Sequence, residues 1–235
     1  MPIQPTNARL GSEANDEPRT GVSRRLILKR SVTAAAIIAP LGILAACGTA
    51  SGKSGATATP AMVLADLAPT SQNKAAFAEI QSDENAHVAF LVNALGSSAR
   101  PKPTFKPLAQ TDINAFASLA RTLENVGVGA YLGAAPSISS KAYLAAAGSI
   151  LTIEARHAGF LDVLLKQPIS ANGAFDKPMT QAEVVAAAGP FIVSLNGGSD
   201  PSAMLANDAD ILNFALLLEY LEADFYNTNV PKFFS

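Results

Sequence analysis

Two segments of the chain carry a carboxylate and an imidazole three residues apart. Residues 84–91 and 154–161 both have the pattern Glu-x-x-His-x-x-Phe-Leu, and they contain the only two histidines of the chain, His87 and His157. Residues three apart lie on one face of an α-helix, so each motif points both groups in the same direction. Two such helices, with one Glu from each of two further helices, make the ligand set of a di-metal carboxylate bundle.

Both motifs lie on the apolar face of the helix that contains them. A buried carboxylate without a partner is strongly unfavourable, so Glu84 and Glu154 need a hydrogen-bond partner or a cation. Glu–His hydrogen bonds with a purely structural role are the alternative, but two copies of the motif favour a metal site. The face positions, spaced by three and four residues, are Phe77, Ile80, Glu84, His87, Leu91 and Leu95 in the first helix and Ala147, Ile150, Glu154, His157, Leu161 and Leu164 in the second.

Two other segments repeat a second pattern, Leu-Glu followed by a tyrosine seven residues after the glutamate. One contains Glu124 and Tyr131, and the other contains Glu219 and Tyr226. The chain thus has two helices of each kind, which is the internal symmetry of a pseudo-twofold di-metal site. Two adjacent cations need several anionic oxygens and a nitrogen ligand each, and four glutamates with two histidines supply them.

Glu219 and Glu222 compete for the fourth carboxylate position. The repeat matches Glu219 with Glu124, whereas a helical projection puts Glu222 nearer the middle of the apolar face. We rank Glu219 first and expect Glu222 to be an extra ligand or a carboxylate that supports the ligands. Tyr131 and Tyr226 either donate hydrogen bonds near the site or lie at the edge of the core.

These motifs resemble the ferritin-like superfamily, most closely the bacterial ferritin-like domain proteins of the desiccation-related type. The resemblance covers about residues 72–227 and implies an all-α fold, a ferritin-like four-helix bundle that holds two Fe or two Mn ions. In that family the Leu-Glu-x-Leu-Glu helix comes first, but here it is last. The resemblance therefore implies a circularly permuted chain. Alternatives are a helix exchanged in a domain-swapped homodimer and a truncated tandem chain.

Hydrophobic periodicity predicts the helices and the connections that position these residues. We expect connections at 96–110, which holds three prolines, and at 168–207. Thr111 is expected to cap the second helix, and Gly127 and Gly129 should weaken it unless a neighbouring backbone approaches closely. The predicted helices span about 72–95, 111–133, 140–167, 180–188 with a capping box at Thr180, and 208–227 with a tail after Pro231.

The N-terminal residues have the features of an export signal. We expect residues 1–22 to be disordered. The pair Arg24-Arg25 precedes an apolar run at about 32–46 that is short for a membrane span. This arrangement resembles a twin-arginine export signal. A short membrane anchor is the alternative.

The apolar run ends in Leu-Ala-Ala-Cys, which resembles a bacterial lipobox with Cys47 as the lipidated residue. Cleavage by an ordinary signal peptidase competes with this interpretation. We therefore divide the chain into a signal peptide with lipobox at 1–47, a flexible tether at 48–70 and the bundle at 71–235. The protein would be exported to the periplasm or cell envelope and held at the membrane by lipid.

Composition excludes some classes of protein. Six of the 17 Lys and Arg residues precede residue 31, so the rest of the chain is acidic and shows no basic stripe for nucleic acid. A single cysteine excludes an intramolecular disulfide framework. The sequence thus predicts an exported di-metal protein that acts on iron, oxygen or peroxide. The alternative is a non-catalytic envelope lipoprotein, in a stress or desiccation setting, whose bundle is structural.

Overall fold

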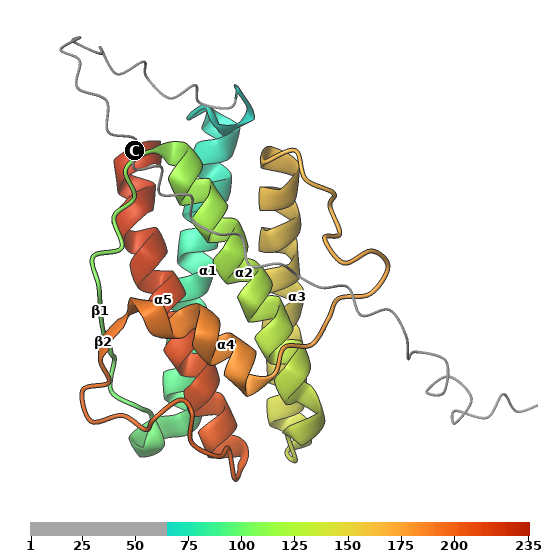
Figure 1. Ribbon diagram of the computed structural model, residues 1–235, viewed down its shortest axis with the longest axis vertical. Coiled ribbons are helices and arrows are strands. Elements are labelled where there is room, and N and C mark those ends of the chain that lie inside the picture. Colours follow the sequence, from blue (N-terminus) through green and yellow to red (C-terminus); the bar gives the residue numbers. More distant parts are fainter. Residues whose placement is uncertain (1–64) are drawn as a thin grey trace, which may run out of the picture. The chain divides into compact units, whose positions relative to one another are not determined.

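The structure is a computed structural model that describes residues 65–235 (Figure 1). The predicted signal peptide, Cys47 and residues 48–64 of the predicted tether lie outside the described residues. The secondary structure consists of α1 (Ser71–Leu95), β1 (Thr104–Phe105), α2 (Ile113–Ala134), α3 (Lys141–Leu164), α4 (Gln181–Ala188), β2 (Ile192–Ser194) and α5 (Asp208–Phe234), with short 3-10 turns at Ala65–Leu67, Gly96–Ser98, Ala135–Ser137 and Gly189–Phe191.

Four long helices form the bundle, so the all-α prediction is confirmed. α1 packs along α5, and α2 packs along α3. In Figure 1, α1 and α2 run downward whereas α3 and α5 run upward. Side chains tie the helix ends together: Lys74 Nζ donates to the backbone oxygen of Ser235 at 2.6 Å, and Asp208 accepts the N–H groups of Ser139 and Ser140 at 2.8 Å each. α5 therefore folds back along α1 within one chain.

Two long connections cross the length of the bundle and are bound to α5 and to each other. β1 and β2, which the sequence did not predict, pair antiparallel and join the two connections. Asn213 of α5 accepts the N–H of Arg100 at 2.6 Å. Near the other end of α5, Asn229 accepts the N–H of Gln110 at 2.8 Å and donates to the carbonyl of Leu108 at 3.1 Å. These bonds hold the first connection along the helix that completes the bundle.

Local hydrogen bonds and backbone conformation determine where the helices begin and end. Asp112 caps α2 by accepting the N–H groups of Asn114 and Ala115, so the prediction of Thr111 as the cap is wrong. The predicted capping box of Thr180 with Glu183 is confirmed. α3 ends at Leu164, before the predicted 167, and Lys166 has a positive φ of 56°.

α5 continues for seven residues beyond the predicted end, through Pro231 to Phe234. Proline lacks an N–H and normally ends a helix. Here the last turn is held by packing, because Phe234 is 5% exposed and stacks on Phe77 with ring centroids 4.3 Å apart. The prediction of a tail after Pro231 is therefore wrong.

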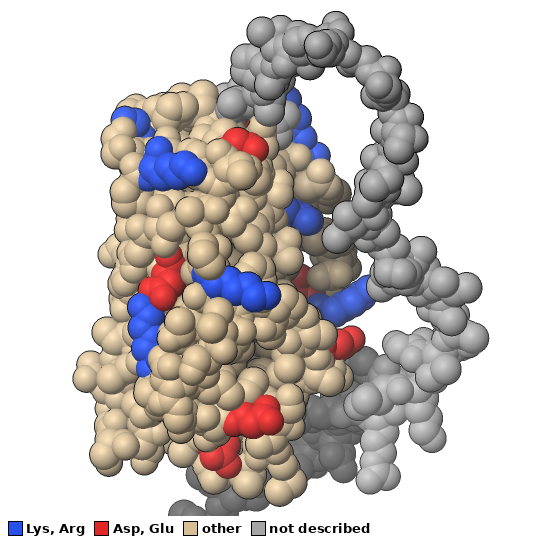
Figure 2. Space-filling model, turned by 60° about the vertical axis from the view of Figure 1, so that its left-hand side comes forward, with Lys and Arg blue, Asp and Glu red and all other residues tan. Residues whose placement is uncertain are grey.

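The core consists of two apolar clusters, one toward each end of the bundle. Along α1 the first cluster includes Phe77 and Ile80, and the second includes Leu91. Glu84 and His87 lie between them along α1, whereas on α2 and α5 the first cluster continues past the glutamates through Ala130, Phe214 and Leu218. In the described part of the chain, no helix is long and apolar enough to span a membrane. Figure 2 shows that the face beside β1 and β2 carries few charged side chains, of both signs.

Candidate metal centre

All seven residues predicted as metal ligands lie buried inside the four-helix bundle, among the side chains of the two apolar clusters. α1 and α3 each supply a glutamate and a histidine, α2 supplies one glutamate and α5 supplies two. Each of the seven residues is at most 8% exposed. The members of this Glu–His cluster are Glu84, His87, Glu124, Glu154, His157, Glu219 and Glu222.

Six of these residues fall into two overlapping groups, each of which could hold a metal ion. Within each group, one ligand atom per residue lies within 4.8 Å of the others. The first group is Glu84, His87, Glu154 and Glu219, and the second is Glu84, Glu124, Glu154 and His157. Glu84 and Glu154 belong to both groups, as carboxylates that bridge two cations would.

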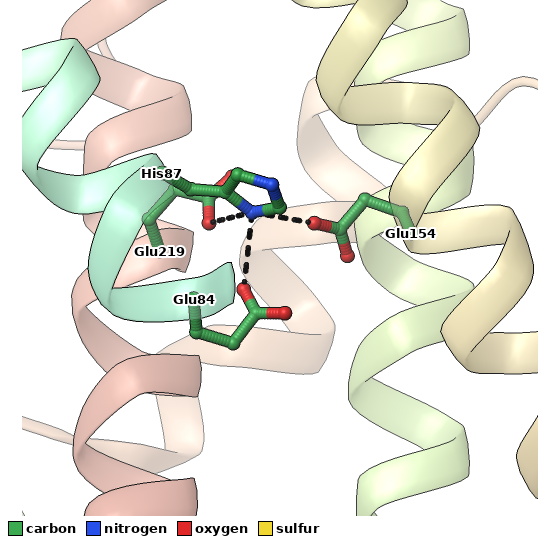
Figure 3. Close-up of side chains that lie close together, drawn as sticks. All are labelled: Glu84, His87, Glu154 and Glu219. Atoms are coloured by element: carbon green, nitrogen blue, oxygen red, sulfur yellow. Dashed lines mark hydrogen bonds and ion pairs between the residues drawn. The ribbon is translucent and has the colours of Figure 1, made fainter. Parts of the chain in front are cut away.

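Each imidazole presents its Nδ1 atom to glutamates from several helices. His87 Nδ1 lies 3.2 Å from Glu154, 3.3 Å from Glu219 and 3.4 Å from Glu84. Figure 3 shows these three carboxylates converging on His87 from α3, α5 and α1. His157 Nδ1 lies 3.0 Å from Glu84 and 3.2 Å from Glu124. The same edge of each ring thus faces the shared carboxylates.

Several carboxylate oxygens in the cluster are buried but accept no hydrogen bond from the described residues. They are Glu84 Oε1, both oxygens of Glu154, and Glu219 Oε2. All but Glu154 Oε2 lie 3.0–3.3 Å from a histidine Nδ1, so two nitrogens face three of these oxygens. A buried polar atom normally has a hydrogen-bond partner, and a buried charge needs a counter-charge or a metal. Five glutamates with two histidines also leave an excess of acidic groups. Carboxylate oxygens and imidazole nitrogens are ligands that iron and manganese accept, so the residues present fit a metal centre.

Two tyrosines donate hydrogen bonds to the outer carboxylates, as one of our alternatives predicted. Tyr131 donates to Glu219 Oε1 at 2.5 Å, and Tyr226 donates to Glu124 Oε1. Glu219 belongs only to the first group of four and Glu124 only to the second, and each accepts its hydrogen bond through one oxygen. The tyrosines therefore fix the orientation of these two carboxylates and repeat the pseudo-twofold relation of the helices.

The sequence matches the model of a family described as the ferritin-like domain, over residues 46–167 and 207–234. This match covers more than half of the chain. The chain belongs to the ferritin-like domain family. No curated protein and no solved structure matches it. Residues 168–206, between the two matched parts, form most of the connection that contains α4 in this ferritin-like chain.

Burial and mutual repulsion perturb the ionisation of the ferritin-like centre. Burial acts to lower the pKa of His87, but the carboxylates of Glu154, Glu219 and Glu84 outweigh it and raise the pKa to about 12. The pKa of His157 is likewise raised to about 11, against the effect of burial, by Glu124 and Glu84. Without cations, both rings are therefore held in the protonated state.

The pKa values of three glutamates and of both tyrosines shift in the direction that keeps these groups neutral. Burial, followed by repulsion from neighbouring carboxylates, raises the pKa of Glu154 and Glu222 well above the ordinary value. Burial and the adjacent Glu84 also raise the pKa of Glu124. Burial and the neighbouring glutamates raise the pKa of Tyr131 and Tyr226 well above 10.0. Both tyrosines therefore remain hydrogen-bond donors at neutral pH.

Glu222 is 3% exposed but belongs to neither group of four. In the helix repeat it corresponds to Gly127 of α2. A Cβ atom at Gly127 would lie 2.7 Å from Glu154 Oε2 and 3.5 Å from Glu222 Oε1. The glycine thus leaves space for two carboxylates, and its close neighbour is the Glu154 side chain rather than a backbone.

Gly129 of α2 accommodates a different neighbour, Met179. The N–H of Met179 donates to the carbonyl of Gly129 at 2.9 Å. A Cβ atom at Gly129 would lie 2.5 Å from the Met179 side chain, and one at Gly133 would lie 2.0 Å from the Met179 carbonyl oxygen. These glycines therefore let the connection before α4 lie against the bundle.

Sequence reasoning missed Asp83 and the pair of Arg121 with Asp162. Asp83 Oδ2 lies 3.2 Å from His157 Nε2. Arg121 of α2 donates to Asp162 of α3, whose side chain is buried. Asp83 directly precedes Glu84, and this adjacency is the only sequence signal that could have identified it. Its partner is on another helix, so helix periodicity alone does not reveal the contact.

A pocket of about 200 Å³ reaches the cluster between α1 and α3. Its lining includes Glu79, Asp83, Arg156 and His157, together with apolar side chains such as Ile153. His157 is therefore the member of the cluster that borders this pocket.

Proposed function

We propose that the chain is an exported ferritin-like protein that binds two Fe or two Mn ions and acts on iron, oxygen or peroxide. Glu84 and Glu154 would bridge the two ions. Glu124 and His157 would complete one position, and Glu219 and His87 would complete the other. The observation that carries the proposal is the excess of buried carboxylate oxygens over donors in Glu84, Glu154 and Glu219. Four of these oxygens have no hydrogen bond, and three of the four share the two histidine Nδ1 atoms as their only nearby positive charge among the described residues.

Bound iron or manganese would supply electron transfer to a small oxidant. The chain's own residues hold the centre and limit access to it. The two apolar clusters exclude water from either end. Tyr131 and Tyr226 orient the outer carboxylates, and Glu222 adds a further acidic group that can act as an extra ligand or hold a proton. The pocket beside His157 supports entry of a small ion or oxidant between α1 and α3.

The cellular setting is proposed from sequence motifs. Arg24-Arg25 and the following apolar run support twin-arginine export, and Cys47 supports a lipid anchor in the periplasm or cell envelope. The desiccation-related type and the circular permutation belong to the same proposal. Recovery of the full chain in membranes, and release of the Cys47→Ser variant into the soluble fraction, would test the anchor.

The decisive experiment on function is elemental analysis of the purified chain, combined with an optical titration. We expect about two Fe or Mn ions per chain and a change in the absorption spectrum when peroxide is added. The alternative function, a structural envelope lipoprotein, predicts protein that lacks metal and a melting temperature that does not change on chelation. That result would remove the di-metal proposal.

A further inference from the structure

The two metal positions that we propose have matching sets of ligand residues. Each position shares Glu84 and Glu154 and has one histidine and one outer glutamate of its own. Each outer glutamate also accepts a hydrogen bond from a tyrosine. We call Glu124 and His157 the His157 position, and Glu219 and His87 the His87 position.

The two imidazoles differ in the hydrogen-bond partner of Nε2, the ring nitrogen that faces away from the shared carboxylates. His157 Nε2 lies 3.2 Å from Asp83 Oδ2, whereas His87 Nε2 has no hydrogen-bond partner among residues 65–235. The sequence explains the difference, because Asp83 precedes Glu84 and an isoleucine, Ile153, precedes Glu154. Ile153 has no group that can accept a proton from His87. Asp83 thus breaks the pseudo-twofold relation.

An acceptor on the far nitrogen affects how a histidine binds metal. A carboxylate that accepts the Nε2–H bond fixes the tautomer, so that the lone pair of Nδ1 faces the metal. The same bond restricts rotation of the ring and makes Nδ1 a stronger donor. In this structure, His157 Nδ1 already faces Glu84 and Glu124 while Nε2 faces Asp83. His87 is contacted by glutamates at Nδ1 only, so no acceptor on Nε2 in the described part of the chain fixes its tautomer.

We propose that Asp83 is a positioning residue that makes the two metal positions unequal, so that the His157 position binds its ion more tightly than the His87 position. This inference rests on the proposed di-metal function. Loss of a group of this kind typically weakens metal affinity by about 10–100-fold. The inference concerns affinity, which can be measured without any turnover.

The test is a calorimetric titration of the purified, metal-free full chain with Mn²⁺. We expect two binding steps in the native chain, and we expect Asp83→Ala to weaken the tighter step by about 10–100-fold without changing the weaker step. Asp83→Asn, which keeps an oxygen acceptor, should restore part of the affinity. The matched control is Glu79→Ala, because Glu79 lines the same pocket on α1 and forms no contact with His157. It should leave both steps unchanged.

Combining the substitutions assigns the effect to one ring. In a His87→Ala background, Asp83→Ala should still weaken the remaining step. In a His157→Ala background, the same substitution should change nothing, because its partner is gone. Two results would overturn the role of Asp83 but leave the proposed function standing. One is an equal loss of Mn²⁺ affinity in Glu79→Ala and Asp83→Ala, and the other is an Asp83→Ala variant in which both binding steps are unchanged. A native chain that binds no Mn²⁺, Fe²⁺ or other divalent ion would overturn this inference and the proposed function together.

Discussion

The glutamates of the cluster lie buried and close together, which is electrostatically unfavourable when they are ionised. Glu84, Glu124, Glu154 and Glu219 are each 0% exposed, and each pair of groups repels when ionised. Two protonated histidines neutralise only part of this charge. Protons on the glutamates can supply the remainder in the metal-free protein, and cations can supply it in the metal-bound protein. Metal binding and proton release should therefore be coupled.

Replacement of Glu154 by glutamine tests the shared carboxylates. Glu154→Gln keeps the shape of the side chain but removes a charge common to both metal positions. We expect the metal content to fall from about two ions per chain to one or none, as measured by elemental analysis. The metal-free form should still fold, because burial and the neighbouring glutamates raise the pKa of Glu154 and so already favour an uncharged group there. Full metal occupancy in this variant would contradict the assignment.

The stability of the metal-free protein should decrease as pH rises. The pKa of His87 is raised to about 12 and that of His157 to about 11, so the folded state keeps protons that the unfolded chain releases above about 6.5. Their contribution is full below that pH and is lost as the pH approaches 11 to 12. Raised pKa values of Glu154 and Glu222 act in the same direction from about 4.5 upward.

Melting temperatures measured with a chelator from pH 5 to pH 10 check this prediction. We expect a continuous decrease in the chelated protein and a smaller decrease with Mn²⁺ or Fe²⁺ present, because cations replace the protons. A metal-free melting temperature that rises between pH 7 and pH 10 would contradict the ionisation states that we assign to the two histidines.

At the scale of the helices, α2 provides space that the metal centre requires. Gly127→Ala would place a methyl group 2.7 Å from Glu154 Oε2. The end of a glutamate side chain can move, so we expect the fold to persist and the carboxylate to be displaced. Metal affinity should then fall by about tenfold or more.

The matched control for this prediction is Gly148→Ala in α3, where the added methyl group has no neighbour within 4 Å. Alanine favours a helix over glycine by roughly 0.5–1 kcal/mol, so this variant should be slightly more stable. It should bind metal like the native chain. Calorimetric titrations of both variants, compared with their melting temperatures, separate an effect on the centre from an effect on the helix. Native metal affinity in Gly127→Ala would show that Glu154 has more freedom than the structure indicates.

Helix periodicity and motif spacing predicted much of the architecture, because both are local properties. The Glu-x-x-His motifs and the Leu-Glu repeat identified residues that the structure brings together, and the four long helices were expected. Contacts that depend on tertiary packing were not predictable. Met179 lies against Gly129 and Gly133 from a distant connection, and Phe234 extends α5 past a proline by stacking on Phe77. Asp83 bonds across helices for the same reason.

At the scale of the whole molecule, the last helix completes the centre. α5 supplies Glu219 and packs along α1, so the six residues of the two groups come from one chain. This geometry does not require a helix from a second molecule. The circular permutation stays a prediction from the resemblance to other ferritin-like proteins. The start of α1 and the end of α5 lie favourably for a test, because Lys74 bonds to Ser235.

A permuted variant should fold and bind metal, at a lower melting temperature than the native chain because it lacks the buried Leu67, Val184 and Ala188. The design begins at residue 207, joins Ser235 to residue 70 through a short Gly-Ser linker and ends near residue 167, which puts α5 before α1. Because the linker joins ends that already lie close together, it should cost little conformational entropy. We expect about two bound ions, a native-like helical circular-dichroism spectrum and metal affinity that does not depend on protein concentration. A variant that binds metal only as a dimer would show instead that α5 is exchanged between chains, and an unfolded variant would show that residues 168–206 are needed to hold α5 in place.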